Sequence, residues 1–297
     1  MILLDYSGVA IGRVTANLYK EIQNPTDQNL ELIRYQILNA ISSLSAKFKA
    51  EFGPVVIACD SRSYWRKDVF PYYKASRKKS RDKSPIDWKN LFGHVSTVKE
   101  ELREHFPYRV VEVEGAEADD VIGCVTKEFS TNPQLFRVDG LITTPEPILV
   151  VSEDSDFYQL HKYPNVDQWS IKHKKYLTLR SPEAIARHLH NKLITGETGD
   201  GIPNALSDDD TLVNEAKRQK PIYQTLLESS FGQPIPEAMK KNYERNRQLI
   251  DFDYIPENVH KAILDELKKK PNGSRSKMFQ FFVDRQLTRQ LDQINNF

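Results

Sequence analysis

Short apolar runs separated by longer amphipathic stretches mark the first half of the chain. The runs are rich in Val, Ile and Leu, which is typical of strands buried on both faces of a sheet. In the stretches between them, apolar side chains recur every three or four residues, and this spacing predicts helices with one buried face. The expected strands cover residues 2–4, 55–59, 108–113 and 148–151, and the clearest expected helices cover residues 30–48 and 116–129.

Strands that alternate with helices predict an α/β fold with a mostly parallel central sheet flanked by helices. After about residue 180 the strand pattern fades, and helical patterns alternate with Gly and Pro breaks. In this chain of 297 residues we therefore expect an α/β core over residues 1–180 and a smaller helical C-terminal domain over residues 181–297. No apolar run is long enough to span a membrane.

Charge is unevenly distributed, although the net charge is only +1. Between Arg62 and Lys83 there are nine basic residues and two acidic ones, interleaved with Tyr, Trp and Phe. This local excess of positive charge indicates a polyanionic partner, although the net charge of the chain is close to zero. The N-terminus lacks signal-peptide features, and Cys59 and Cys124 lie in apolar stretches as expected of buried thiols. A cytoplasmic location is expected.

Acidic residues follow the expected strands closely. Asp5 and Asp60 come directly after two of them, and Glu117 and Asp154 follow the other two within a few residues. Each acid alone has a simple structural explanation, such as a helix cap or a turn. In a parallel sheet, however, the carboxyl ends of the strands share one edge, where so many like charges would repel one another. The whole set is Asp5, Asp60, Glu117, Asp119, Asp120, Asp154, Asp156, Glu197 and Asp200.

Divalent cations relieve such repulsion, and ligands that are all oxygen favour Mg²⁺ or Mn²⁺ over Zn²⁺. The acids outnumber the ligands of one octahedral ion, so two Mg²⁺ ions are expected, with Mn²⁺ as a substitute. Paired ions serve in-line displacement at phosphorus, because one activates water and the other stabilises the leaving oxygen. The basic segment after Asp60 supplies Lys and Arg for phosphates and aromatic rings for unpaired bases.

Several motifs around these acids occur in a fixed order. They are Leu3-Leu4-Asp5-Tyr6-Ser7, Ile57-Ala58-Cys59-Asp60, Tyr64-Trp65-Arg66, Tyr72-Tyr73-Lys74-Ala75-Ser76-Arg77, Glu117-Ala118-Asp119-Asp120 and Ser152-Glu153-Asp154-Ser155-Asp156-Phe157. As an ordered set they resemble the 5′ nucleases, a family that includes the flap endonucleases, nearly from end to end. Residues 160–166 and 250–256 are similar to the ribonuclease H type found in T-even phages.

The resemblance implies a PIN-like 5′ nuclease core in which a basic arch, at about residues 62–95, covers the active site. The first ion would be held by Asp5, Asp60, Asp119 and Asp154, with Glu117 and Asp120 behind them or bridging through water. The second would be held by Asp156, Glu197 and Asp200. Lys74 and Arg66 would reach the scissile phosphate and act in catalysis with Asp119 and Asp154. The nucleic acid would also contact Tyr73, which can stack on the terminal base, and Arg77, Lys78 and Lys79.

The chain departs from the family pattern in three places. Glu197 replaces a shorter Asp, so the second ion is expected to be held more loosely or through water. A helix-turn-helix-like element that opens at residues 196–203 would grip duplex phosphates, but Asp208, Asp209 and Asp210 follow it and would repel them. Phage members carry an N-terminal extension linked with sliding-clamp binding, whereas this chain starts at the first strand, so clamp binding is not expected.

The leading hypothesis is a two-metal 5′→3′ exonuclease and flap endonuclease that acts on RNA and DNA 5′ ends, flaps and forks. It would remove lagging-strand RNA primers in phage replication, as a monomer, with a single-stranded-DNA-binding protein as a candidate partner. One alternative is a PIN-type endoribonuclease, which shares the sheet and the acids but cuts single-stranded RNA internally. The other is a non-catalytic nucleic-acid-binding accessory protein, which would lack some of the acids.

Overall fold

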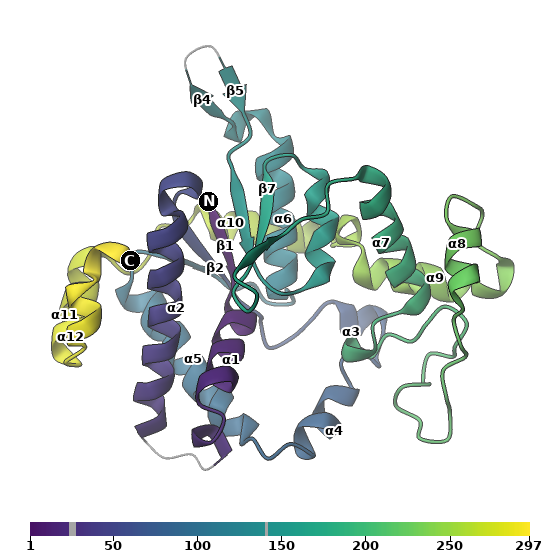
Figure 1. The fold of residues 1–297 in the computed structure, drawn as a ribbon, viewed down its shortest axis with the longest axis horizontal. Coiled ribbons are helices and arrows are strands. Elements are labelled where there is room, and N and C mark those ends of the chain that lie inside the picture. The colour runs from purple at the N-terminus through teal and green to yellow at the C-terminus, as the bar shows by residue number, and fades with distance from the viewer. Residues whose placement is uncertain (24–27, 140–141) are drawn as a thin grey trace.

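The computed structural model describes residues 1–23, 28–139 and 142–297, and a six-stranded sheet lies at its centre (Figure 1). The strand order is β3-β2-β1-β6-β7-β8. All neighbours pair in parallel except β8, which is antiparallel to β7. The bounds are β1 (Ile2–Asp5), β2 (Val55–Ala58), β3 (Arg109–Val111), β6 (Ile148–Val151), β7 (Val166–Ser170) and β8 (Lys175–Leu177). The expected mostly parallel sheet is confirmed.

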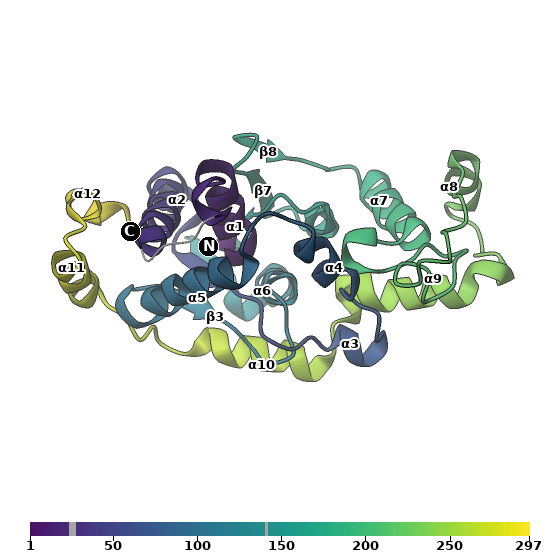
Figure 2. The same cartoon turned by 90° about the horizontal axis from the view of Figure 1, so that it is seen from below.

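Helices cover both faces of this sheet (Figure 2). Along β1, Ile2 and Leu4 join the hydrophobic cluster on one face, and Leu3 joins the cluster on the other, as the two-residue period of a strand dictates. The first face carries α1 (Tyr6–Asn17), α2 (Gln28–Phe52) and α5 (Trp88–His105). The second carries α6 (Ala118–Thr131) and α10 (Glu257–Lys268). The helices expected over 30–48 and 116–129 correspond to α2 and α6.

The basic segment leaves the end of β2 and returns at α5. It contains two short helices, α3 (Arg66–Val69) and α4 (Ser76–Asp82). Trp65 precedes α3 at the N-terminal base of the arch, where the segment leaves the sheet, and Trp88 opens α5 at its C-terminal base. Leu91 and Val95 of α5 are buried in the core, so the last part of the expected arch, up to residue 95, belongs to a core helix. The two-stranded hairpin of β4 (Arg137–Asp139) and β5 (Ile142–Thr144) stands apart from the sheet (Figure 1).

The C-terminal part is helical but does not pack as one separate body. The helices α7 (Pro182–Thr195), α8 (Gln224–Ser230) and α9 (Glu237–Ile250) contribute to two small hydrophobic clusters, one of which also contains Phe70 and Tyr73 of the basic segment. By contrast, α10 and α11 (Arg275–Asp284) bury side chains in the clusters that cover the sheet, and α12 (Thr288–Asp292) packs beside α11. Among the described residues, no helix has the length and apolarity needed to cross a membrane.

Candidate active site

Four Asp residues lie at the carboxyl edge of the sheet, each held by a local hydrogen bond or a helix start. Asp5 ends β1 and caps α1, and its carboxylate accepts from the Gly8 amide at 2.9 Å and the Ser152 hydroxyl at 3.1 Å. Asp60 accepts from the amide of Ala118 at 3.0 Å. Asp154 accepts from the amide of Asp156 at 2.8 Å. Asp119 is in the first turn of α6. The predicted first-ion residues are thus brought to one edge.

These carboxylates have little compensating charge among the described residues, where the charge of Lys74 only partly offsets the raised pKa of Asp119. Removal of water by the surrounding protein, with the charges of Asp60 and Asp154, raises the pKa of Asp5 from 3.8 to about 6. Burial, Asp154 and Asp5 raise the pKa of Asp119 well above its ordinary value. Within the described ranges, no Lys or Arg forms an ion pair with any of the four. An all-oxygen set that lacks positive charge fits a hard divalent cation.

The acids are not drawn together as tightly as a bound ion requires. In the part of the chain that the structure describes, no three Asp, Glu, His or Cys side chains are close enough to share one ion. The edge therefore has the donor chemistry of a metal site, with side chains that would have to converge on the cation.

A second acidic group lies beyond Asp154 and already has a cation. Lys192, near the end of α7, forms an ion pair with Asp156 and lies with its Nζ 3.2 Å from Oε2 of Glu197. Burial and the charge of Asp154 nevertheless raise the pKa of Asp156 to about 6. The Lys192 ammonium thus occupies the space between two of the three predicted ligands of the second ion. Sequence reasoning missed Lys192, although a basic residue one helical turn before Gly196-Glu197 was a usable signal.

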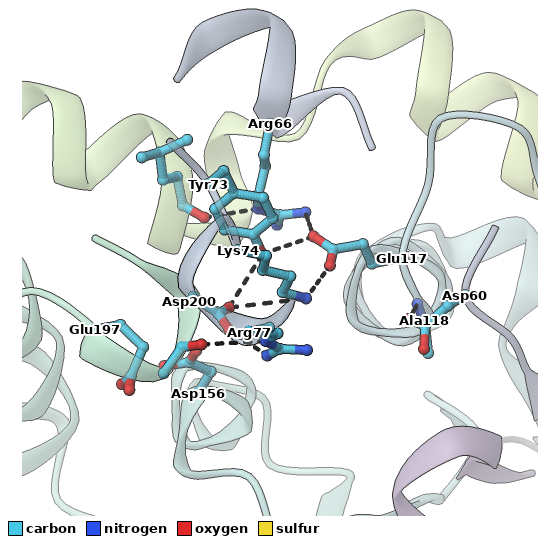
Figure 3. A network of polar contacts seen from close by, with 12 residues as sticks. Asp60, Arg66, Tyr73, Lys74, Arg77, Glu117, Ala118, Asp156, Glu197 and Asp200 are labelled. Atoms are coloured by element: carbon cyan, nitrogen blue, oxygen red, sulfur yellow. Dashed lines mark hydrogen bonds and ion pairs between the residues drawn. The ribbon is translucent and has the colours of Figure 1, made fainter. Parts of the chain in front are cut away.

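The third predicted ligand, Asp200, is bound to the arch (Figure 3). Its carboxylate forms an ion pair with Arg77 and lies 3.1 Å from the hydroxyl of Tyr73. Lys74 is 3.9 Å from Asp200 and forms a closer pair with Glu117, which also lies 2.8 Å from the Tyr73 hydroxyl. Burial lowers the pKa of Lys74, but Asp200 and Glu117 outweigh it and raise the pKa. Tyr73 is 3% exposed, so its ring is not free to stack on a base here.

The close contact between the arch and the loop at residues 198–201 depends on two unusual backbone positions. Lys74 adopts a left-handed conformation, with φ of 57°, and its amide donates to the carbonyl of Asp200 at 2.7 Å. Gly201 has φ of 75°, and an added Cβ would lie 2.8 Å from the carbonyl oxygen of Tyr72. A non-glycine residue at positive φ is strained and persists where its surroundings enforce it. The arch therefore contacts residues 198–201 directly. We call these residues the second-ion loop, because they include Asp200, a predicted ligand of the second ion.

Arg66 is far less accessible than its predicted role requires. It is 4% exposed and pairs with Glu117 at 2.9 Å and Asp120 at 2.8 Å, while its Nε donates to the carbonyl of Leu249 at 2.8 Å. Asp120 is fully buried and also accepts from the indole of Trp65 at 3.1 Å. Arg66 and Asp120 therefore form a buried ion pair that links the arch to α6, and the bond to Leu249 links the arch to α9. This geometry does not support Asp120 as a metal ligand or Arg66 as a group that reaches phosphate.

The remaining predicted contacts are at the outer surface of the arch. Lys78 is exposed, and Lys79 forms an ion pair with Glu215 in the loop before α8. The three acids that were expected to repel phosphate are each paired within the chain: Lys217 binds Asp208 and Asp210, and Arg245 binds Asp209. Their charge is largely compensated, so the expected repulsion is weaker than the sequence indicates.

Comparisons with known proteins identify the family of the chain. Residues 1–189 match the model for the 5′-3′ exonuclease N-terminal, resolvase-like domain, and residues 187–297 match that for the C-terminal part of T4 RNase H. The chain is 31% identical to ribonuclease H of Enterobacteria phage T4, over 99% of this chain and 95% of that protein. The chain belongs to the 5′-3′ exonuclease family. This 5′ nuclease is also 25% identical to flap endonuclease Xni of Shewanella piezotolerans, over 63% of this chain and 67% of that protein.

Solved structures show the same fold. A bacteriophage T5 flap endonuclease variant, crystallised as a pseudo-enzyme-product complex with DNA and metal ions, matches with a TM-score of 0.60 and 18% identity, over 90% of the nuclease and 97% of that chain. The same T5 protein co-crystallised with metal ions also gives a TM-score of 0.60, at 17% identity and over 90% and 98% of the two chains. The expected PIN-like core and the expected nuclease activity are confirmed.

Proposed function

We propose that the nuclease uses Mg²⁺ to hydrolyse phosphodiesters at RNA and DNA 5′ ends and flaps, removing RNA primers in phage DNA replication. The observation that carries the proposal is the set of Asp5, Asp119 and Asp154 at one edge of the sheet, where burial and the charges of neighbouring carboxylates raise the pKa of Asp5 and Asp119. These three, with Asp60, would hold the first ion. When bound, Mg²⁺ supplies a Lewis acid that activates water and stabilises charge on the phosphate.

The arch residues that face this edge would bind the substrate. Lys74 and Arg77 now pair with Glu117 and Asp200, and a phosphate would have to compete with these carboxylates for both cations. Charge-assisted contacts with phosphate would then hold the strand beside the first-ion acids. A second ion at Asp156, Glu197 and Asp200 would require Lys192 and Arg77 to move away. Arg66 and Asp120 would position the arch base and Glu117 rather than touch the substrate.

We infer further that the substrates are DNA and RNA–DNA duplexes with free 5′ ends, bound by the nuclease as a monomer. A structural neighbour, the T5 flap endonuclease variant, was crystallised with DNA, which supports DNA as a ligand. A single-stranded-DNA-binding protein is a candidate partner. The helix-turn-helix-like element at residues 196–203 would contact the duplex, since its neighbouring acids are paired internally.

Product mapping on a labelled 5′-flap duplex, with Mg²⁺ titrated from zero, tests this function. We expect Mg²⁺-dependent products with 5′-phosphates from the wild type, and none from Asp119→Asn or Asp154→Asn. A circular single strand in the same assay separates the alternatives, because cleavage of the circle favours a PIN-type endoribonuclease. Full Mg²⁺-dependent cleavage by either variant would contradict the proposed site.

A further inference from the structure

A groove with a volume of about 530 Å³ lies beside the acidic edge, between α1 and the turn that joins β7 to β8. Ser152 and Glu153 line it, and they directly precede Asp154. The groove is thus continuous with the candidate active site, although none of the groove's basic residues belongs to that site. The residues that carry the argument are Gly8, Gly12, Arg13, Glu153, Lys172 and Lys174.

The wall formed by α1 has an open position. A Cβ added to Gly12 would have no heavy atom of the described residues within 4 Å, so they leave the space above this turn of the helix open. Gly8 and Ala16 are one turn away on either side and share this face of the helix. Because these side chains are so short, an occupant can approach the helix backbone closely.

The groove is also lined by more positive than negative side chains. Arg13, Lys172 and Lys174 line it, and none of them forms an ion pair within the described ranges. The Nε of Arg13 is shielded from solvent and has no hydrogen-bond partner in the same part of the chain. The groove's one acid, Glu153, is already engaged, because it accepts from the Ser170 hydroxyl at 2.7 Å and the Lys172 amide at 2.8 Å.

The basic turn is fixed in shape by these hydrogen bonds. The Ser170 hydroxyl also accepts from the amide of His173 at 2.8 Å, and Lys174 is left-handed with φ of 51°. Glu153, the residue next to Asp154, thus fixes the backbone of the turn that carries both lysines at the rim of the groove. A shielded Arg13 donor without a partner among the described residues, two exposed lysines on a fixed turn and an open floor together fit an elongated anion with close-set negative charges.

We propose that this groove binds the sugar-phosphate backbone of the duplex part of the substrate, outside the arch. Arg13, Lys172 and Lys174 contact successive phosphates, and the small side chains of α1 let the backbone lie against the helix. The inference rests on the proposed function for the identity of the substrate. It adds a binding surface that directs the strand toward the edge that carries Asp5 and Asp154.

The test measures binding of a fluorescent 5′-flap duplex in chelator, so that cleavage does not contribute. For Lys172→Glu/Lys174→Glu we expect affinity to fall by about tenfold or more, and the slope of log K against log salt to become shallower by about two. Gly12→Leu fills the groove without changing charge, and Leu favours a helix over Gly, so the fold should tolerate it. It should also weaken binding, with a melting temperature that is equal to or higher than that of the wild type.

Lys261→Glu is the matched control, since Lys261 is exposed on α10 and forms no ion pair within the described ranges. It should change affinity less than twofold, roughly the effect of one distant surface charge. Wild-type affinity and salt slope in both groove variants would overturn the inference. Cleavage by the wild type would then still stand, so this result is distinct from failure of the proposed function, which Asp119→Asn tests by cleavage alone.

Discussion

Lys192 lies between Asp156 and Glu197, paired with the first and 3.2 Å from the second. An ammonium in this position does what a divalent ion would do, because it offsets the repulsion between two carboxylates. A second ion bound by Asp156 and Glu197 would need the space that Lys192 occupies, so we expect the two to compete. The side chain of Glu197 is one methylene longer than that of Asp, which would let its carboxylate reach either cation.

Replacement of Lys192 by methionine should therefore tighten metal binding. We expect the Mg²⁺ concentration for half-maximal cleavage to fall several-fold, on the order of 1 kcal/mol, because the ion no longer displaces a paired ammonium. Isothermal titration with Mg²⁺ and a cleavage titration would both report it. Lys261→Met is the control for loss of one positive charge, and an unchanged or higher Mg²⁺ requirement in Lys192→Met would argue against competition.

Asp5→Asn should stabilise the metal-free nuclease while abolishing cleavage. The pKa of Asp5 is raised from 3.8 to about 6, so the folded state holds this proton more tightly than the unfolded state. Stability from this group is therefore present below about pH 4 and is lost as pH rises through about 6. In chelator, the variant should exceed the wild type by on the order of 2 kcal/mol at pH 8 and by almost nothing at pH 4.

Denaturant unfolding at the two pH values measures this difference, and Mg²⁺ gives an internal control. Added Mg²⁺ should raise the wild-type melting temperature and have a smaller effect on Asp5→Asn, because the variant has lost a ligand. A variant that is less stable than the wild type at pH 8 in chelator would show that Asp5 is not under the repulsion described.

Loss of Arg66 should unfold the protein more readily than loss of Lys74. Arg66 is buried against Glu117 and Asp120, so Arg66→Met leaves uncompensated charge and should cost about 3–5 kcal/mol. In Lys74→Met, Glu117 keeps Arg66 and Tyr73, so the loss of stability should be smaller. Urea unfolding and cleavage assays of both variants separate the structural role from the catalytic one. An Arg66→Met variant that is stable but inactive would support the phosphate-binding role predicted for Arg66.

Gly201→Ala should lift the arch from the second-ion loop. The new Cβ would press on the carbonyl of Tyr72 at 2.8 Å, and the left-handed backbone adds strain of about 1 kcal/mol. We expect faster proteolysis within α4 and a raised KM for flap substrates. Gly232→Ala is a matched control, since Gly232 has φ of 72° but no atom of the described residues lies within 4 Å of an added Cβ. Equal effects in the two variants would mean that strain, not the contact, matters.

The common edge of Asp5, Asp60 and Asp154 could be predicted from the sequence because local rules suffice there, whereas their binding of an ion stays a prediction. Strand ends in a parallel sheet share an edge, so Asp5, Asp60 and Asp154 could be placed together from the hydrophobic pattern alone. The strands β7 and β8 were not predicted, because β7 alternates polar with apolar residues and β8 is only three residues long. Their pairing, which forms the groove beside α1, was therefore not predicted either. These elements take their shape from hydrogen bonds to Glu153, a contact that spacing cannot show.

The pairing of individual charges was likewise beyond the sequence. Arg66 follows the family motif for a phosphate-reaching residue, yet its environment is fixed by the carbonyl of Leu249, far along the chain. The Lys192 pairs depend on how α7 docks against the loop after Asp154. Composition shows that cations and acids are both abundant, and only the tertiary contacts decide which acids are left for a metal.

The two bases of the arch carry built-in optical reporters. Trp65 donates its indole N–H to Asp120, and Trp88 lies against Phe92 with the guanidinium of Arg81 5.9 Å from its ring. The indole of Trp169 lies instead in the core cluster, beneath Lys47. With Trp169 replaced by phenylalanine, intrinsic fluorescence would follow the arch as it leaves its carboxylates for a phosphate. The rate at which the arch binds to and leaves these carboxylates could thus be measured by Trp fluorescence in unlabelled protein.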